Sequence, residues 1–326
     1  MPTRKPLPSE LGDAFSVRAA TALGVSTHHL RSPDLGRPFR GARTRPASAL
    51  SPADDSPYTA QAEARRRAAR AYAPLLQPGQ FISHHSAAAL WLAPLPLRRD
   101  VEGLLVPEDA IPLDVSTFGD GHLIRATGVS AHRARIRTSS ITRIDGIPVA
   151  DAETTWASLG TLSLIDLVAL GDCFCRVWSP GVGRPNAGVP PISTVARLER
   201  AARSGRRVGI RRLREALPLI RTDSWSPRES AVRCHLVFAG LPEPQLNVDV
   251  HSEDGRFLGC VDLAYPELKI AIEYQSMLHT SQYSADVERL ARLRAHGWNV
   301  IEVTAALLAD PDAMVDRVRE AIRHRR

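Results

Sequence analysis

Two carboxylates bracket a strand-turn-strand run in the final third of the chain. Asp262 ends one apolar run, and Glu273 closes another at residues 268–272, which is apolar except for Lys269. A charge beside buried apolar residues is costly unless it is paired or bound to a metal. Mg²⁺ binds through one or two carboxylates and keeps water and phosphate oxygens in its other positions. The pair therefore predicts a metal-dependent phosphodiesterase, with Asp262 and Glu273 as ligands of Mg²⁺ or Mn²⁺.

A third candidate catalytic residue follows Glu273. Because side chains alternate along a strand, Glu273 and Gln275 point the same way. This arrangement, with Asp262 on one strand and Glu273-Tyr274-Gln275 on its hairpin partner, resembles the PD-(D/E)XK nuclease fold. That family usually has Lys where this chain has Gln275, and favours Gly at Ser276. The resemblance implies that Gln275 orients the attacking water, but an amide stabilises developing charge less than Lys does. We expect a lower rate, or a part of the task moved elsewhere.

The resemblance extends to both sides of the tripeptide. Glu229 follows Ser226-Pro227 and matches the first-helix Glu that completes such sites, which makes it the fourth catalytic candidate. The pattern over residues 222–326 is similar to small endonuclease-like domains related to very-short-patch-repair nucleases. The resemblance implies an auxiliary group of His279, Asp286 and Arg289.

The same region predicts an order of elements independently of any family. Ser226 and Pro227 are helix-start residues, and Gly240-Leu241-Pro242 is a helix stop. Alternating apolar residues predict strands, and apolar stripes predict helices. The predicted fold class is mixed α/β, with a C-terminal PD-(D/E)XK restriction-endonuclease-like α-β-β-β-α-β-α core. Its expected elements are a helix from 227, strands at 245–251, before 262 and at 268–273, a helix at 284–295, a strand near 301–303 and a helix after Asp310.

Several of these residues have simpler interpretations. Asp262 could cap a turn in solvent, and His279 could be a packed or exposed histidine. Asp286 and Arg289 are also spaced as an i,i+3 surface pair, worth a few tenths of a kcal/mol. Glu273 is the hardest to explain without a partner or a metal.

Composition favours an anionic partner. The 326 residues suit two or three domains, and 44% are hydrophobic, enough to bury cores. The net charge is +7, and of the 42 basic residues only Lys5 and Lys269 are lysine. Arginine is the better bidentate phosphate ligand, although its excess also reflects genome composition. DNA is the expected partner.

The cysteines and the apolar runs predict an intracellular chain. Cys173 and Cys175 fall on one predicted helix, where i and i+2 point to different sides, and Cys234 and Cys260 are isolated. We expect reduced thiols rather than zinc or disulfides. With no 18-residue apolar run and no apolar signal core after Lys5, we expect a soluble, cytoplasmic protein without a membrane partner.

Residues 1–45 predict a helix-turn-helix-like region. They carry eight basic and three acidic side chains, a local net charge of +5. Helices are expected at 15–23 and 27–31, with residues 35–43 as a wing and residues 44–58 as a linker. An ordinary helical hairpin is the alternative. The helix-turn-helix spacing is carried by Ala20, Gly24, Val25 and Leu30.

Residues 59–177 predict a mixed α+β domain. Helices are expected near 61–73, from His84-His85, at 151–159 and at 166–176, and strands at 113–116 and 122–127. The His pair is better explained as a helix start than as a metal site. With the N-terminal region, Ser83-His84-His85-Ser86-Ala87-Ala88 and the run at 151–172 resemble AbiEi-type antitoxins of type IV toxin–antitoxin systems. That resemblance implies promoter DNA as a ligand and, less directly, a toxin partner.

An arginine-dense helical connector is predicted at residues 193–221. Residues 191–221 contain nine arginines against two glutamates. Either the connector tracks a DNA backbone, or it is a solvated helix. Its candidate nucleic-acid-binding residues are Arg206, Arg207, Arg211 and Arg212.

These patterns predict a metal-dependent DNA endonuclease, or a nuclease-derived DNA-binding protein. The alternative is an antitoxin-type transcriptional regulator whose nuclease fold is a non-catalytic scaffold. The sequence leaves a homodimer open.

Overall fold

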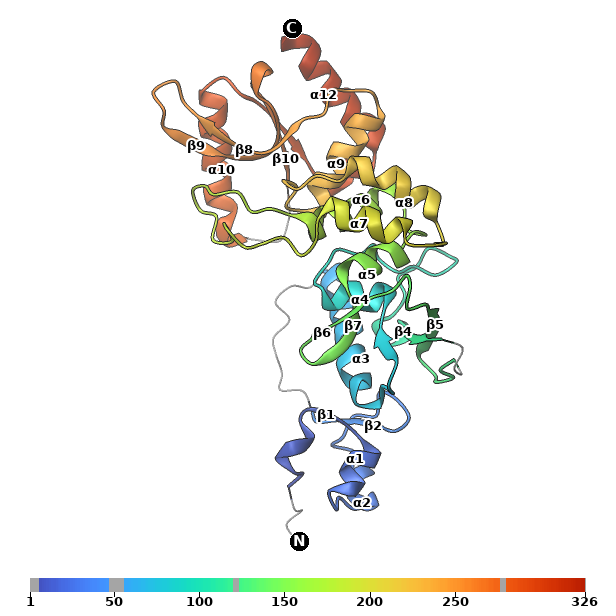
Figure 1. Cartoon of the computed structure of the whole chain (residues 1–326). Coiled ribbons are helices and arrows are strands. Elements are labelled where there is room, and N and C mark those ends of the chain that lie inside the picture. Colours follow the sequence, from blue (N-terminus) through green and yellow to red (C-terminus); the bar gives the residue numbers. More distant parts are fainter. Residues whose placement is uncertain (1–5, 47–55, 120–122, 276–279, 326) are drawn as a thin grey trace. The chain divides into compact units, whose positions relative to one another are not determined.

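The computed structural model describes residues 6–46, 56–119, 123–275 and 280–325 (Figure 1). The chain forms two compact units, and each is described by itself. Unit 1 comprises residues 1–161 and 199–210, and unit 2 comprises residues 162–198 and 211–326. This grouping differs from the four predicted segments, because the helix expected at 166–176 packs with the elements of unit 2. The predicted mixed α/β class is confirmed.

Unit 1 contains helices and two sheets. One sheet pairs β1 with β2, and the other has the order β5-β4-β3-β7-β6. Its elements are β1 (Ala14–Ser16), α1 (Val17–Ala22), α2 (Thr27–Leu30), β2 (Ala42–Thr44), α3 (Pro57–Tyr72), β3 (Gln80–Ile82), α4 (His84–Leu90), β4 (Leu113–Phe118), β5 (Val129–Ala134), β6 (Ile141–Ile144), β7 (Ile147–Ala150) and α5 (Ala152–Ser158).

The two short helices expected in residues 1–45 are present as α1 and α2. Ser16 and Ser26 cap them, and Gly24 makes the turn with a φ of 78°. Ala20 and Leu30 are among the residues that fill the small core beneath them. The first helix begins two residues later than predicted, because residues 14–16 pair with β2.

The strand predicted at residues 122–127 is wrong. His122 lies outside the described residues, and residues 123–127 form no strand. The Val129 N–H donates to the Ala126 carbonyl, which closes a turn through Gly128, where φ is 77°. The strand β5 follows this turn.

The predicted helical connector contains two helices, α7 (Val195–Arg203) and α8 (Ile210–Ala216). Gly209 interrupts it with a φ of 70°, a conformation that suits glycine. A Cβ there would lie 2.0 Å from the Gly160 carbonyl oxygen, so the two backbones meet closely within unit 1. The break therefore has a packing cause that spacing does not reveal.

Unit 2 has a mixed sheet of order β11-β10-β9-β8, in which β10 is antiparallel to β9 and parallel to β11. The predicted α-β-β-β-α-β-α order is confirmed, with a short additional helix before the last one. The elements are α6 (Leu164–Cys175), α9 (Pro227–Phe238), β8 (Gln245–His251), β9 (Phe257–Tyr265), β10 (Ile270–Tyr274), α10 (Thr280–Ala295), β11 (Asn299–Val303), α11 (Ala305–Leu308) and α12 (Pro311–Arg325).

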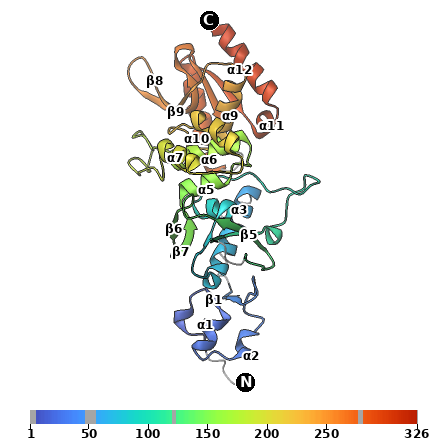
Figure 2. The same cartoon turned by 45° about the vertical axis from the view of Figure 1, so that its right-hand side comes forward.

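Helices cover both faces of the unit 2 sheet (Figure 1), as the turned view also shows (Figure 2). On one face, Ile270 and Ile272 of β10 pack in a core with Val232 of α9 and Met314 of α12. On the other face, Ala264 and Ala271 pack in a core with Leu290 and Leu293 of α10. The alternation along β10 therefore places Glu273 on the face that α10 covers.

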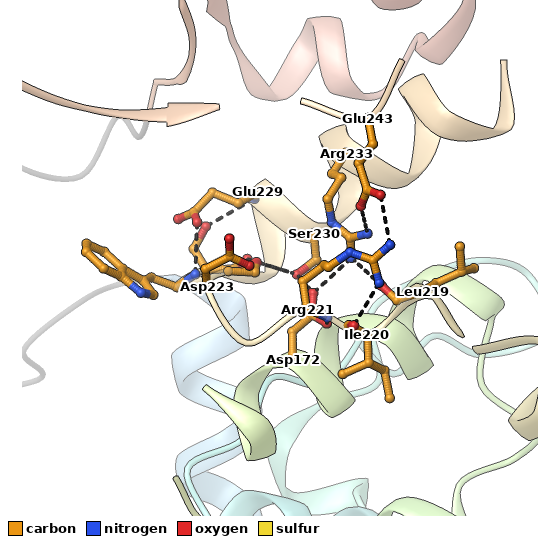
Figure 3. A network of polar contacts seen from close by, with 12 residues as sticks. Asp172, Leu219, Ile220, Arg221, Asp223, Glu229, Ser230, Arg233 and Glu243 are labelled. Atoms are coloured by element: carbon orange, nitrogen blue, oxygen red, sulfur yellow. Dashed lines mark hydrogen bonds and ion pairs between the residues drawn. The ribbon is translucent and has the colours of Figure 1, made fainter. Parts of the chain in front are cut away.

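A buried ion network joins α6 to α9 (Figure 3). Arg233, fully buried, donates to Asp172 Oδ2 at 3.2 Å, to Glu243 Oε1 at 2.9 Å and to the Leu219 carbonyl at 2.7 Å. Ser230 also donates to Asp172 Oδ2, at 2.7 Å. Burial raises the pKa of Asp172 to about 6, although Arg233 opposes this rise. The network fixes the start of α9, which carries Glu229.

Removing Asp172 should destabilise unit 2. In Asp172→Ala, the guanidinium of Arg233 stays buried and loses one of its two carboxylate partners, which costs about 3–5 kcal/mol in such pairs. Urea unfolding at pH 8, above the pKa of about 6, measures this loss. The matched control is Glu215→Ala, which removes an exposed pair with Arg211 and should cost about 0.5 kcal/mol. Equal losses in both variants would contradict the role given to Asp172.

Candidate carboxylate site

Asp262 and Glu273 come together on adjacent strands, as the sequence predicts. The antiparallel register pairs Ile272 with Leu263, so the next opposite positions are Glu273 and Asp262. Directly opposite residues share one face of a sheet, about 4.5–5.5 Å apart at Cβ. The Tyr274 N–H donates to Asp262 Oδ2 at 2.9 Å, which ties the Asp262 carboxylate to β10.

Arg289 of α10 holds Glu273 with both of its terminal nitrogens. Nη1 lies 2.6 Å from Oε1 and Nη2 lies 3.2 Å from Oε2. The Glu273 side chain is only 3% exposed. Arg289 also contacts Asp286 Oδ1 at 3.4 Å, so the predicted i,i+3 pair is present. This contact is longer than the two bonds of Arg289 to Glu273. His279 lies outside the described residues.

Glu229 approaches from α9. Its N–H is capped by Ser226, and its Oε2 accepts hydrogen bonds from the Trp225 N–H at 2.9 Å and from Asn247 Nδ2 at 2.7 Å. Asn247 lies opposite Asp262 in the register of β8 and β9, between the pairs Leu246–Leu263 and Val248–Val261. Glu229, Asp262 and Glu273 are hereafter called the carboxylate site.

Electrostatics shows that the three carboxylates interact. Burial raises the pKa of Glu273 to about 8, and repulsion by Asp262 adds to this rise while Arg289 opposes it. Burial likewise raises the pKa of Glu229 to about 7, again with repulsion from Asp262. Burial raises the pKa of Asp262, although the Tyr274 hydrogen bond and Arg289 oppose it. Two carboxyls can therefore hold or release protons near neutral pH.

Gln275 directly follows β10 and is partly exposed. Its N–H donates to the Val303 carbonyl at 2.9 Å, which extends the pairing with β11 beyond the strand end. Continued alternation puts Gln275 on the Glu273 side of the sheet. Gln275 carries no charge, and the cation that contacts Glu273 is Arg289.

The donor chemistry of the carboxylate site fits a hard divalent cation. Carboxylates that are buried and repel one another are stabilised by such an ion. In the described ranges, no set of three or more His, Cys, Asp or Glu side chains is close enough to hold a metal by itself. The fit is therefore to an ion held by Asp262 and Glu273 and completed by water and phosphate oxygens. Arg289 bonds both oxygens of Glu273, so such an ion would compete with it.

The four predicted nucleic-acid-binding arginines fall in different units. In unit 1, Arg206 is exposed, whereas Arg207 donates to the backbone carbonyls of Thr138 and Ala201. In unit 2, Arg211 is exposed and pairs with Glu215, and Arg212 donates to the Leu162 carbonyl at 2.8 Å. Arg206 and Arg211 are therefore the most accessible of the four to a phosphate, and Arg207 stabilises the fold through its backbone contacts.

Two groups beside the carboxylate site are absent from the sequence prediction. Asn247 adopts a φ of 49°, a conformation that Asn tolerates better than most residues, and binds Glu229 from there. The Trp225 ring packs against that of Trp178 in a tilted arrangement, with centroids 5.2 Å apart, and Arg184 lies 4.7 Å from the Trp225 centroid. In the sequence, Arg184 could have been noticed as the single arginine of the Pro/Gly-rich segment 179–191.

Unit 1 holds a separate polar cluster that the His84-His85 pair joins. His132 Nε2 lies 2.9 Å from Asp114 Oδ1, and the His84 ring stacks on His132 at 3.8 Å. His85 Nδ1 lies 3.9 Å from Asp114 Oδ2. Burial lowers the pKa of His84 to about 4, so it is neutral at pH 7. The cluster links α4 to β4 and β5, and within the described residues no metal-holding group includes it.

The comparisons with known proteins do not identify a function for the chain. No family model matches the chain, and no solved structure matches it. Two proteins of Mycobacterium tuberculosis, from different strains and both called uncharacterized, are 33% identical to it over 106 residues. The match covers 32% of this chain and 38% of each relative, so the chain spans little more than a third of their length. In the described residues, no helix is both long and apolar enough to cross a bilayer.

The raised carboxyl pKa values predict that unit 2 loses stability as the pH rises. Glu273 and Glu229 have folded pKa values of about 8 and about 7, above the ordinary value of 4.5, so the folded state binds more protons. Their contribution is full below pH 4.5 and declines until the pH passes about 8. Urea unfolding from pH 5 to pH 9 should show this decline, and Glu273→Gln should flatten it.

Glu302→Gln is the matched control for this measurement, because Glu302 lies opposite Glu273 on β11 in an exposed pair with Arg294. It should leave the pH dependence unchanged. A slope that Glu273→Gln does not alter would mean that Glu273 is ionised throughout.

Proposed function

We propose that unit 2 is a metal-dependent DNA endonuclease domain of PD-(D/E)XK type. The observation that carries the proposal is the meeting of Asp262 and Glu273 on adjacent antiparallel strands, within the electrostatic reach of Glu229. The α-β-β-β-α-β-α order agrees with it, and the net charge of +7 favours an anionic substrate.

The residues of the carboxylate site have separate tasks in this proposal. A divalent cation, Mg²⁺ or Mn²⁺, held by Asp262 and Glu273 supplies charge neutralisation of the phosphodiester and a water of lowered pKa. Glu229 can take up a proton, and its pKa, raised to about 7, suits this task near neutral pH. Gln275 orients the attacking water through its amide.

Nicking of supercoiled plasmid tests the proposal. With Mg²⁺ or Mn²⁺, the full chain should convert supercoiled DNA to open circles, and Asp262→Asn or Glu273→Gln should slow this by about a hundredfold or more. Glu302→Gln, on the same sheet but exposed, should cleave like the unchanged chain. Equal nicking by Glu273→Gln and the unchanged chain would reject Glu273 as a catalytic residue.

A second function is favoured by a specific feature of the same site. Gln275 stands in place of the usual Lys, and Arg289 already neutralises Glu273. A non-catalytic scaffold joined to the α1–α2 region of unit 1 would be a DNA-binding regulator of antitoxin type. In this function the carboxylate site stabilises the fold, and DNA contacts come from exposed basic residues such as Arg18 and Arg31.

A gel-shift experiment separates the two functions. If the chain is a regulator, replacing Arg18 and Arg31 together with Ala should weaken duplex binding by about tenfold and reduce its salt dependence. Glu273→Gln should then leave binding unchanged, and no nicking should be seen with either metal ion. Undiminished binding by the double variant would contradict a DNA-binding role for α1 and α2.

A further inference from the structure

Arg289 supplies a built-in cation to the carboxylate site. Its guanidinium bonds both Glu273 oxygens and also donates to the Cys260 carbonyl at 2.8 Å. The guanidinium occupies one lone-pair site on each Glu273 oxygen, so a metal ion that binds Glu273 at those sites has to displace Arg289. In this structure, therefore, Glu273 is neutralised by a neighbouring side chain.

The stem of Arg289 lies in a space that only glycine leaves open. A Cβ at Gly259 would come within 2.8 Å of the Arg289 Cγ and 2.9 Å of its Cδ. The Cys260 carbonyl, one residue further along β9, then fixes the guanidinium. Position 259 thus offers a way to move Arg289 without removing its charge.

Arg289 also has a second anionic partner nearer to solvent. Its side chain is 21% exposed, against 3% for Glu273, and Nη2 already contacts Asp286, whose side chain is 51% exposed. Rotation of the long arginine side chain toward Asp286 would release Glu273. The released guanidinium could then form a bidentate contact with a phosphate.

We propose that Arg289 competes with the divalent ion for Glu273, and that a nucleic-acid phosphate draws it away. Metal binding is then coupled to substrate binding, because each phosphate contact made by Arg289 frees Glu273. This inference rests on the proposed nuclease function, and it names how the same site is regulated. When the Arg289 guanidinium leaves Glu273, its contact with Asp286 keeps it near the carboxylate site.

A structural role for the ion pair gives a different expectation. If Arg289 only fastens α10 to the sheet, its removal leaves Glu273 buried without a partner and disturbs the site. The affinity for a metal ion would then fall or stay the same. If Arg289 competes with the ion, the affinity rises when Arg289 is removed or displaced.

Calorimetric titration of the full chain with Mn²⁺ tests the proposal. Arg289→Gln should bind Mn²⁺ about tenfold more tightly than the unchanged chain, and Gly259→Ala, which displaces the Arg289 stem, should change the affinity in the same direction. Arg292→Gln is the matched control, because it removes an exposed arginine from the same helix. It should bind Mn²⁺ like the unchanged chain.

A second titration adds a short duplex with phosphorothioate linkages, which resist hydrolysis. The duplex should tighten Mn²⁺ binding by the unchanged chain, and should tighten it much less in Arg289→Gln, where the competition is already gone. Circular dichroism checks that each variant is folded. If Arg289→Gln does not fold, the result of Gly259→Ala decides the test.

The outcomes separate this inference from the proposed function. Mn²⁺ binding by the unchanged chain that is as tight as, or tighter than, binding by both variants would overturn the competition while leaving a metal site. Absence of Mn²⁺ binding in every variant, with and without duplex, would overturn the metal-dependent nuclease as well.

Discussion

The ion pair between Glu273 and Arg289 is the interaction on which the carboxylate site depends. The hydrogen-bond register of the sheet places Glu273 opposite Asp262, and α10 covers that face. Two acids in such a place repel each other and lose their hydration, so each needs a cation or a proton to neutralise it. Arg289 provides the cation at 2.6 Å, with its stem in the space that Gly259 leaves open and its guanidinium bonded to the Cys260 carbonyl. The geometry of the site and the packing of α10 therefore have one cause.

The sequence predicted the parts of this site that local rules determine. Ser226 and Pro227 begin α9 as expected. The strand expected at 268–273 begins only at Ile270, because residues 266–268 form a turn that ends at Lys269, where φ is 47°. The buried network of Arg233 was not predicted, because Asp172 lies 61 residues away and in a helix expected to belong to another domain. Spacing carries no information about such distant partners.

The errors and omissions have similar physical reasons. Local spacing paired Arg289 with Asp286, three residues before it, and the resemblance placed it in the auxiliary group of the site. Neither identified its main partner Glu273, which is 16 residues away on another element. The strand expected at 122–127 is absent from residues 123–127, and a turn through Gly128 leads instead into β5. The break within the helical connector was not predicted, because the contact of Gly209 with Gly160 depends on a chain segment far away in sequence. Local pattern governs elements, and tertiary contacts decide where they end.

The most direct test of the account is a crystal of the full chain soaked in Mn²⁺ and measured for anomalous scattering. The account predicts a peak between Asp262 and Glu273, with the Arg289 guanidinium turned away from Glu273 toward Asp286. A peak elsewhere, or no peak with Arg289 still bonded to both Glu273 oxygens at saturating Mn²⁺, would contradict it.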